Sequence, residues 1–313
     1  MSESKPRVVV VGSFMMDLVV KAERRPRKGE TLIGDEFGMF IGGKGANQAI
    51  AAARLGAQVH IVGRLGTDLF GDMFISALDK DGINTQFIVR DPEIGTGVGT
   101  PVIDAQGDNS IIIIPRANMR LSIEDVNKAE GAISEADVLL LQLEVPIPSS
   151  QRAAEIARAG GATVILNPAP AQELPDSFLK YIDVITPNET ETEMLTGVEV
   201  FDQSGAQSAA KVLLDKGMSA VVLTLGERGA LLLTQEMTKA IPAYNVEVTD
   251  TTAAGDAFCG ALATAIARDE SLEQAVVYAN AAGAIAVTIM GAEPSMPTQQ
   301  QVEQFLKEKG RNF

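Results

Sequence analysis

The strongest candidate for chemistry is a run of small residues, VEVTDTTAAGDAF, at residues 246–258. The pattern predicts a short strand, a turn of small residues and then the first turn of a helix. Ala253, Ala254 and Gly255 leave the backbone N–H groups of that turn accessible, and the helix dipole makes the turn attractive to an anion. Asp256 adds a carboxylate that could deprotonate a hydroxyl attacking a bound phosphoryl group. The alternative is that Asp256 only favours the start of the helix.

A second glycine-rich segment, GGKGANQAIAAARLGA, spans residues 42–57. Counted from Gly38 it approaches a Walker A loop, but Gly45 stands where a Ser or Thr hydroxyl would bind magnesium, so we reject that motif. The Gly-Gly pair allows the backbone to approach a ligand, and Lys44 and Asn47 offer donors and acceptors suited to a polyhydroxyl compound. A tight turn into a helix, without a ligand, is the alternative.

The segment TPNETE, residues 186–191, reads first as a helix start. Asn188 as N-cap and Glu191 three residues later fit a capping box, which explains the spacing without any ligand. The segment also follows a predicted strand, and open parallel sheets bind ligands at the carboxyl ends of their strands. A role near phosphate or magnesium therefore stays open.

Single polar residues also follow apolar runs elsewhere in the chain. Asp17, Glu144 and Asn167 each come after such a run, so their side chains could line one crevice at the same edge of a sheet. Each of them alone is equally consistent with a solvated strand end. We interpret the only cysteine, Cys259, and the only histidine, His60, as core or edge residues.

The elements that must position these residues alternate between β-branched runs and alanine-rich segments. Strand-like runs lie at residues 8–12, 59–63, 137–143, 163–167, 183–188 and 219–226, and helical segments include 46–57 and 149–160. The apolar run Val8–Met16 is interpreted as a buried first strand. This rhythm predicts an α/β fold of three αβα layers, in which helices cover both faces of a mostly parallel sheet. The C-terminal third is predicted to be mainly helical.

Two segments interrupt that rhythm with loose alternation, which is typical of antiparallel ribbons. Together with the end of the first run they place the strands of a small inserted sheet at about residues 14–20, 31–42 and 96–115, with a turn at D-A-Q-G-D-N. This sheet is a candidate lid. We find no linker that would divide the chain, so residues 1–313 are expected to form a single domain.

Composition limits the possible partners and compartment. Hydrophobic residues make up 46% of the chain, which supports a large core, and the net charge of −15 disfavours binding to nucleic acid or to an anionic membrane. One cysteine and one histidine exclude an internal disulfide and a Cys/His metal cluster. No run approaches the ~18 apolar residues of a membrane span, and no signal cleavage site follows the first run, so the cytoplasm is expected.

Taken together, these motifs resemble the ribokinase family of sugar kinases, within the phosphofructokinase B-type superfamily. The resemblance covers almost the whole chain. GGKGANQA and DTTAAGDAF lie about 200 residues apart in the family's order, and PNETE, LNPAPA, LTLGERG and GAEPS agree as well.

The resemblance implies an ATP-dependent kinase that phosphorylates ribose at the 5-hydroxyl. It implies that Asp256 is the base and that the N–H groups of Ala253, Ala254 and Gly255 stabilise the transferring phosphoryl group. It implies sugar binding by Asp17, Gly43, Lys44, Asn47, Glu144 and Asp256. The family's lid, which closes on the sugar and pairs two subunits, matches the predicted ribbons and implies a homodimer.

The resemblance also implies sites for nucleotide and ions. Asn188 and Glu191 would act near the phosphates and Mg²⁺. The nucleotide would be bordered by Thr224, Gly226, Glu227, Gly229 and Asn280. An activating monovalent cation, K⁺ in this interpretation, would be held by oxygen atoms of Asp250, Thr252, Ala286, Ile289, Gly291 and Ser295.

One departure from the family concerns the sugar. Many bacterial ribokinases carry Asn where this chain has Met15, and a thioether cannot donate a hydrogen bond to a sugar hydroxyl. Some similar proteins with Met at this position resemble 2-deoxyribose kinases, so 2-deoxyribose stays open as the substrate, as does another sugar or a nucleoside. A sugar-binding sensor without catalysis is the alternative of another class.

Overall fold

Strands that are buried on both faces form the centre of the fold, and their β-branched sequences follow from that burial. The structure is a computed structural model that describes residues 5–106 and 109–311. In the first strand, Val8 and Val10 pack into one hydrophobic core, and Val9 and Val11 pack into a second core on the opposite face. Alternate side chains of one strand therefore join the two helical layers to the sheet.

Within the described ranges the main sheet has nine strands. In spatial order they are β13 (Thr238–Ile241), β12 (Ala230–Thr234), β11 (Ala220–Thr224), β10 (Val184–Ile185), β9 (Thr163–Leu166), β8 (Val138–Leu141), β1 (Arg7–Val11), β4 (Gln58–Gly66) and β5 (Asn84–Asp91). From β11 to β5 in this spatial order, each strand pairs in parallel with its neighbour, whereas β12 and β13 add an antiparallel edge. The predicted mostly parallel sheet is confirmed.

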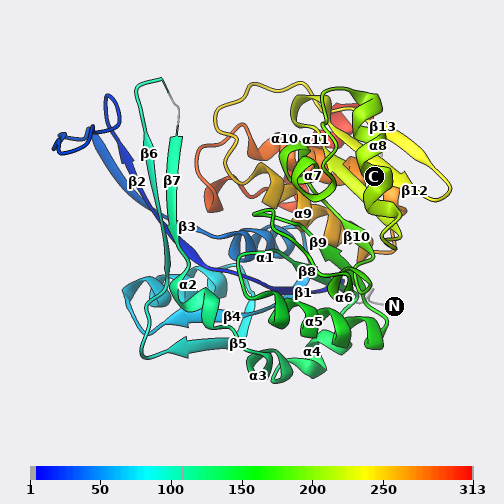
Figure 1. Ribbon diagram of the computed structural model, residues 1–313, viewed down its shortest axis with the longest axis horizontal. Coiled ribbons are helices and arrows are strands. Elements are labelled where there is room, and N and C mark those ends of the chain that lie inside the picture. The colour runs from blue at the N-terminus through cyan, green and yellow to red at the C-terminus, as the bar shows by residue number, and fades with distance from the viewer. Residues whose placement is uncertain (1–4, 107–108, 312–313) are drawn as a thin grey trace.

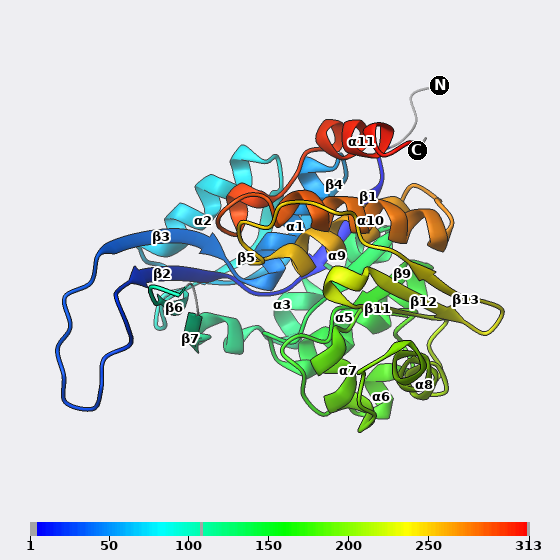
Figure 2. The same ribbon diagram turned by 90° about the horizontal axis from the view of Figure 1, so that it is seen from above.

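Helices cover both faces of this sheet (Figure 2). One layer contains α1 (Lys44–Arg54), α2 (Leu69–Lys80), α9 (Ala254–Ile266), α10 (Leu272–Ala286) and α11 (Gln299–Glu308). The other contains α3 (Ile123–Asn127), α4 (Glu130–Ser134), α5 (Ile147–Gly160), α6 (Asp176–Leu179), α7 (Glu189–Thr196) and α8 (Gln203–Leu214). Short 3₁₀ turns are η1 (Arg116–Arg120), η2 (Gly226–Arg228) and η3 (Glu293–Ser295). The three-layer αβα prediction is confirmed.

A second, four-stranded sheet projects from one side of the main body (Figure 1). Its spatial order is β3 (Glu36–Gly42), β2 (Met15–Lys21), β6 (Gly97–Ile103) and β7 (Asn109–Ile114). Strand β2 pairs antiparallel with β3 and parallel with β6. The segment predicted at 31–42 is a strand only from residue 36, and residues 107 and 108 of the predicted D-A-Q-G-D-N turn lie outside the described residues.

The run Val8–Met16 is not a single strand: its start is the buried first strand, and its end belongs to the lid strand predicted at about residues 14–20. The chain leaves the main sheet after β1 and enters the small sheet as β2. Gly12, between them, is crowded: a Cβ there would lie 2.2 Å from Oε1 of Gln142 and 2.7 Å from Cα of Gly45. The backbone can pass through this contact because glycine has no side chain.

The short strand predicted at the start of residues 246–258 is also absent from the described structure. The N–H groups of Thr249 and Asp250 instead donate to the carbonyl of Val287, just beyond α10. The segment therefore packs along the end of a helix and joins neither sheet. Among the described residues, no helix combines the length and the apolar character that crossing a membrane requires.

Candidate active site

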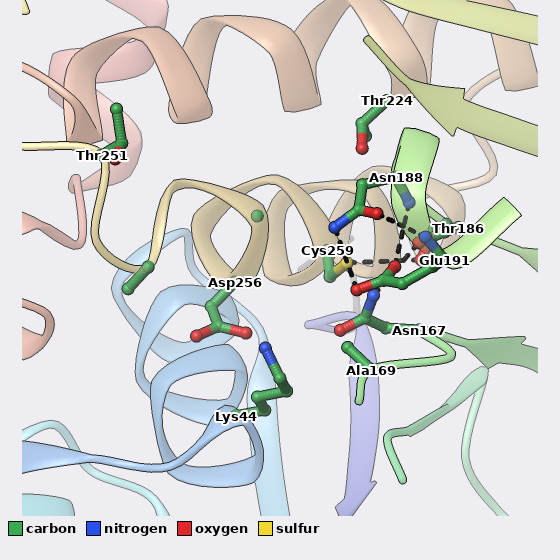
Figure 3. Close-up of a pocket in the computed structure, with 12 residues that line it drawn as sticks. Lys44, Asn167, Ala169, Thr186, Asn188, Glu191, Thr224, Thr251, Asp256 and Cys259 are labelled. Atoms are coloured by element: carbon green, nitrogen blue, oxygen red, sulfur yellow. Dashed lines mark hydrogen bonds between the residues drawn. The ribbon is translucent and has the colours of Figure 1, made fainter. Parts of the chain in front are cut away.

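A cavity of about 230 Å³ lies at the carboxyl ends of β9, β10 and β11, against the first turn of α9 (Figure 3). Its wall is formed by Lys44, Asn167, Ala169, Thr186, Asn188, Glu191, Thr224, Thr251, Ala253, Gly255, Asp256 and Cys259. Parallel strands end together at this edge, so residues far apart in sequence meet there. The two glycine-rich motifs, more than 200 positions apart, both contribute to the wall.

The first turn of α9 forms one side of the cavity. Ala253 is the N-cap residue and adopts a left-handed backbone with φ of 57°, without a capping side chain. The first N–H groups of a helix have no intrahelical partners, and the helix dipole adds partial positive charge. The N–H of Ala254 donates to the carbonyl of Thr251 at 3.3 Å, so an anion bound here would compete with that contact. The turn has the properties of an anion site.

Asp256 lies in this turn, is 6% exposed and is held by two amides from α1. Nδ2 of Asn47 donates to its Oδ2 at 2.9 Å, and Nε2 of Gln48 donates to its Oδ1 at 2.9 Å. Each carboxylate oxygen accepts one amide N–H and keeps a further lone pair. The carboxylate is therefore fixed in orientation and still able to accept a proton.

Lys44 enters the cavity from the start of α1, and its ammonium points toward the Asp256 carboxylate (Figure 3). Burial by itself would lower the pKa of Lys44, but the negative charges of Asp256, Glu144 and Glu191 outweigh it, so the pKa is raised. The side chain is a cation in a cavity whose other charged lining residues, Glu191 and Asp256, are carboxylates. It is suited to a bound anion.

Asp17 occupies β2 of the small sheet, within the lid strand predicted at about residues 14–20, so it does not follow a strand of the main sheet as Glu144 and Asn167 do. Burial raises the pKa of Asp17 to about 6, and the charges of Glu144 and Asp256 add to the shift. Gly42 and Gly99 flank its carboxylate: a Cβ at either glycine would lie 2.4 Å from Oδ2 or 2.3 Å from Oδ1. The two glycines therefore make room for this carboxylate on the sheet.

Glu144 follows β8 and meets the turn before α1. Its Oε2 accepts the backbone N–H of Lys44 at 3.0 Å and the hydroxyl of Ser13. The same hydroxyl accepts the N–H of Gly45 at 3.3 Å. Gly43, the N-cap of α1, has φ of 88°. The structure thus brings together every residue predicted for the sugar and adds Ser13, which had no recognisable motif in the sequence.

The predicted capping box at the start of α7 is confirmed. Oδ1 of Asn188 accepts the N–H of Glu191 at 2.8 Å, and Oε2 of Glu191 accepts the N–H of Asn188 at 2.9 Å. Both side chains also line the cavity, so the structural role leaves the ligand role open. Burial raises the pKa of Glu191, the Asn188 N–H and the charge of Lys44 oppose that effect, and the charge of Asp256 reinforces it.

The residues predicted for the nucleotide lie at the end of β11, in the turn that follows it, and on α10. Thr224 ends that strand and lines the cavity. Gly226 and Glu227 belong to η2, and Gly229, with φ of 93°, follows it. A Cβ on Gly229 would lie 2.2 Å from the carbonyl oxygen of Ile241, and Nδ2 of Asn280 donates to that same carbonyl at 3.3 Å. Gly229 and Asn280 therefore meet at one backbone segment.

Most residues predicted for the monovalent cation belong to two joined loops. Oδ1 of Asp250 accepts the N–H of Thr252 at 2.9 Å and its hydroxyl at 2.6 Å, and Oδ2 accepts the N–H of Gly291 at 2.8 Å. These bonds hold the pKa of Asp250 below its usual value, although burial by itself would raise it. Ile289 donates to the carbonyl of Ala286 at 3.1 Å at the end of α10. Ser295 is buried, and its hydroxyl donates to Ala292.

Of Cys259 and His60, which we interpreted from the sequence as core or edge residues, only Cys259 lies at the cavity. Cys259 lines the cavity, with its sulfur 3.4 Å from Oγ1 of Thr186, and burial raises the pKa of its thiol to about 12. It is therefore a neutral wall residue. His60 lies away from the cavity on β4, where its ring packs against Phe87. Asn167, by contrast, follows β9 and lines the cavity as part of the expected convergence.

Comparison with known proteins gives consistent matches along the chain. Residues 5–299 match the model of the pfkB family carbohydrate kinases. The chain is 42% identical to a ribokinase of Haemophilus influenzae over 300 residues, covering 96% of this chain and 98% of that protein. It is 39% identical to a deoxyribokinase of Salmonella typhi, with 96% and 98% covered. A structure of Arabidopsis thaliana ribokinase complexed with ribose and ATP superposes with a TM-score of 0.91 at 33% identity, covering 97% of this chain and 99% of that one.

Proposed function

Because the chain belongs to the pfkB family of carbohydrate kinases, we propose that it transfers the terminal phosphoryl group of ATP to the 5-hydroxyl of D-ribose. One observation carries the proposal. The Asp256 carboxylate, fixed by two amides, lies in the first turn of α9 at the wall of a cavity that Lys44 also enters. A base beside an anion site is the arrangement that phosphoryl transfer to an alcohol requires.

In this reaction the 5-oxygen of the sugar attacks the γ-phosphorus of ATP, and Asp256 accepts the hydroxyl proton. The bond from the γ-phosphorus to the bridging oxygen breaks, and ADP leaves with the electron pair. The N–H groups of Ala253, Ala254 and Gly255 would stabilise charge on the transferring group. The Lys44 ammonium adds positive charge to the same cavity.

The sugar would be held by Asp17, Gly43, Lys44, Asn47 and Glu144. Support comes from Asn47: its Nδ2 donates to Asp256, whereas its buried Oδ1 has no hydrogen-bond partner within the described part of the chain. An unpaired buried carbonyl oxygen is costly, and a sugar hydroxyl that donates to it would remove that cost. The same contact would place the hydroxyl group close to the base.

ATP would occupy the side of the cavity formed by Asn188, Glu191 and Thr224, and extend toward η2, Gly229 and Asn280. The described residues contain no cluster of three His, Cys, Asp or Glu side chains that could hold a metal by themselves. Mg²⁺ would accordingly take most of its ligands from phosphates and water, which is usual for this ion, with Glu191 as the nearest candidate carboxylate. Bound there, Mg²⁺ would neutralise phosphate charge.

We place K⁺ between the loops joined by Asp250 and Gly291. The donors available there are hard oxygen atoms of the backbone, of Asp250 and of Ser295, which fit a monovalent cation. The loop that carries Asp250 and Thr252 leads directly into Ala253 and α9. A bound cation would therefore steady the anion site from outside the cavity.

A second candidate substrate is 2-deoxyribose, and Met15 favours it. Met15 is 2% exposed, and it lies two residues before Asp17 on β2, so both side chains lie on the same face of the small sheet. Its thioether cannot donate to a hydroxyl, which reduces the cost of a missing 2-hydroxyl. The 39%-identical Salmonella relative is named a deoxyribokinase.

We further propose that the small sheet is a lid over the sugar and the contact surface of a homodimer. The register places Asp17, Phe40, Gly99 and Ile113 on one face, which is the site face. The opposite face carries Phe37, Met39, Ile112 and Ile114, which are 66%, 45%, 70% and 49% exposed. An apolar face of this kind is typical of a surface that a second copy covers.

The decisive experiment measures ADP formation with ribose, 2-deoxyribose, fructose and adenosine, at saturating ATP with Mg²⁺, in the presence and absence of K⁺. Turnover with ribose or 2-deoxyribose decides between the two pentoses, and preference for fructose or adenosine would remove both. Sugar binding in a calorimeter without any ADP formation would instead identify a sugar sensor. Indifference to K⁺ would remove the cation site.

A further inference from the structure

Behind Asp256 lies a chain of buried side-chain amides. Gln142, just after β8, donates from Nε2 to Oε1 of Gln48 at 2.6 Å. Gln48 donates from Nε2 to Oδ1 of Asp256 at 2.9 Å and to Oδ1 of Asn167 at 3.1 Å. Gln48 and Gln142 are completely buried, and Asn167 is 8% exposed. Buried amides at this depth influence one another strongly because water does not screen them.

The direction of this chain is fixed from both ends. The carbonyl of Thr186 can only accept, so Asn167 turns Nδ2 toward it, at 3.1 Å, and presents Oδ1 to Gln48. The Asp256 carboxylate also accepts, so Gln48 uses both N–H bonds of its amide as donors and presents Oε1 to Gln142. Any flip of the Gln48 amide would place its oxygen against two acceptors.

We propose that Gln48 is a positioning residue for the base, and that Gln142 and Asn167 hold Gln48 in the orientation that this role requires. The inference rests on the proposed function, in which Asp256 receives the proton. Asn47 and Gln48 are adjacent in sequence and hold the two oxygens of one carboxylate. Gln48, unlike Asn47, is fully buried and has no contact left to offer a sugar, because both its amide hydrogens and its oxygen already have partners.

The electrostatic consequence follows from the donors. An N–H bond to a carboxylate stabilises its charged form, so loss of Gln48 makes Asp256 easier to protonate and frees it to rotate. The charged and titratable groups around Asp256 are Lys44, Asp17 and Glu191 from other elements and Cys259 from α9 itself. All four remain in a Gln48 variant, so a changed pH dependence reports the amide itself.

The test replaces Gln48 with methionine, which has a similar volume and no donor. We expect Gln48→Met to lower kcat on the order of 10²-fold, as a displaced catalytic group does, with KM for ATP unchanged. The acidic limb of its rate profile should move to higher pH. Gln142→Met removes the contact to Gln48 and leaves Asp256 untouched. It should lower kcat and shift the acidic limb in the same direction as Gln48→Met, but to a smaller extent.

Thr264→Val is the matched control, because Thr264 is also buried, lies on α9 and donates its hydroxyl to the carbonyl of Gly260 within its own helix. It should keep both kcat and the pH profile. A folded Gln48→Met enzyme with wild-type kcat and an unmoved acidic limb would overturn the inference, as would equal losses in the control.

A second readout needs no turnover. A ¹³C-carboxyl NMR titration of the ligand-free wild type and Gln48→Met should show the midpoint of Asp256 at higher pH in the variant. If the wild type phosphorylates no sugar but the Asp256 midpoint is higher in Gln48→Met than in the wild type, the proposed function is refuted and the positioning role stands. Equal midpoints would refute the positioning role even in an active kinase.

Discussion

Nδ2 of Asn47 donates a 2.9 Å hydrogen bond to Oδ2 of Asp256 across 209 positions of the chain. The bond joins the first turn of α1 to the first turn of α9, two helices that pack against each other on the same face of the main sheet. One glycine-rich motif therefore orients the base that the other motif supplies. Changes at either end should affect the same chemical step.

Replacing the base is the first test. Asp256→Asn keeps the shape of the side chain but removes its ability to accept a proton, so kcat should fall roughly 10²- to 10⁴-fold while the fold is retained. Initial rates of ADP formation measure the loss of kcat, and a thermal unfolding curve checks that the fold is retained. Near-normal turnover by a folded Asp256→Asn enzyme would show that another group is the base.

Sugar binding should depend on pH through Asp17. With a pKa of about 6, its carboxylate becomes protonated as the pH falls through that value, and it then loses acceptor strength toward sugar hydroxyls. KM for the sugar is therefore expected to rise below about pH 6, with little change in KM for ATP. Asp17→Asn should bind sugar weakly at every pH, and an equally steep rise in that variant would contradict the assignment.

The same shift predicts an effect on stability. The folded protein holds the Asp17 proton more tightly than the unfolded chain, so the stability of the apoprotein declines as pH rises from 3.8 to about 6. Asp17→Asn carries no charge and should unfold at a higher temperature than wild type at neutral pH. That advantage should largely disappear near pH 3.8, where the carboxyl of Asp17 in the folded wild type is almost fully protonated. Calorimetric unfolding at both pH values measures it.

Met15 should influence the choice between pentoses. Met15→Asn introduces a donor and an acceptor on the site face of β2, so the ratio of kcat/KM for ribose to that for 2-deoxyribose should rise by roughly ten-fold, the value of one hydrogen bond. Competition between the two sugars checks this directly. An unchanged ratio would mean that the side chain at residue 15 does not reach the 2-position.

The outer face of the small sheet should control assembly. Ile112→Glu places a charge on this apolar face and should convert a dimer into a monomer in light scattering. Ile123→Glu is the control, because Ile123 is 42% exposed on α3, in the helical layer of the main body. A wild-type monomer, or equal effects of the two substitutions, would contradict a dimer through this sheet.

Much of the architecture was readable from local patterns. β-branched runs and alanine-rich segments predicted the parallel sheet and its helical layers, because a strand buried on both faces has a nearly continuous apolar sequence. The Asn188–Glu191 capping box was also readable, since its partners are three residues apart. The close contact that lets the chain leave the main sheet at Gly12 was not readable, because its partner Gln142 lies 130 positions away.

The sequence alone determined the chemical groups: a carboxylate after a turn of small residues, a Gly-Gly-Lys turn, and strands that end in polar residues. Only the tertiary structure decided their partners. It placed Ser13 on Glu144, and Gln48 between Gln142 and Asp256. Periodicity and capping report interactions within a few residues, whereas these contacts depend on the order of strands in the sheet and on which helices pack together.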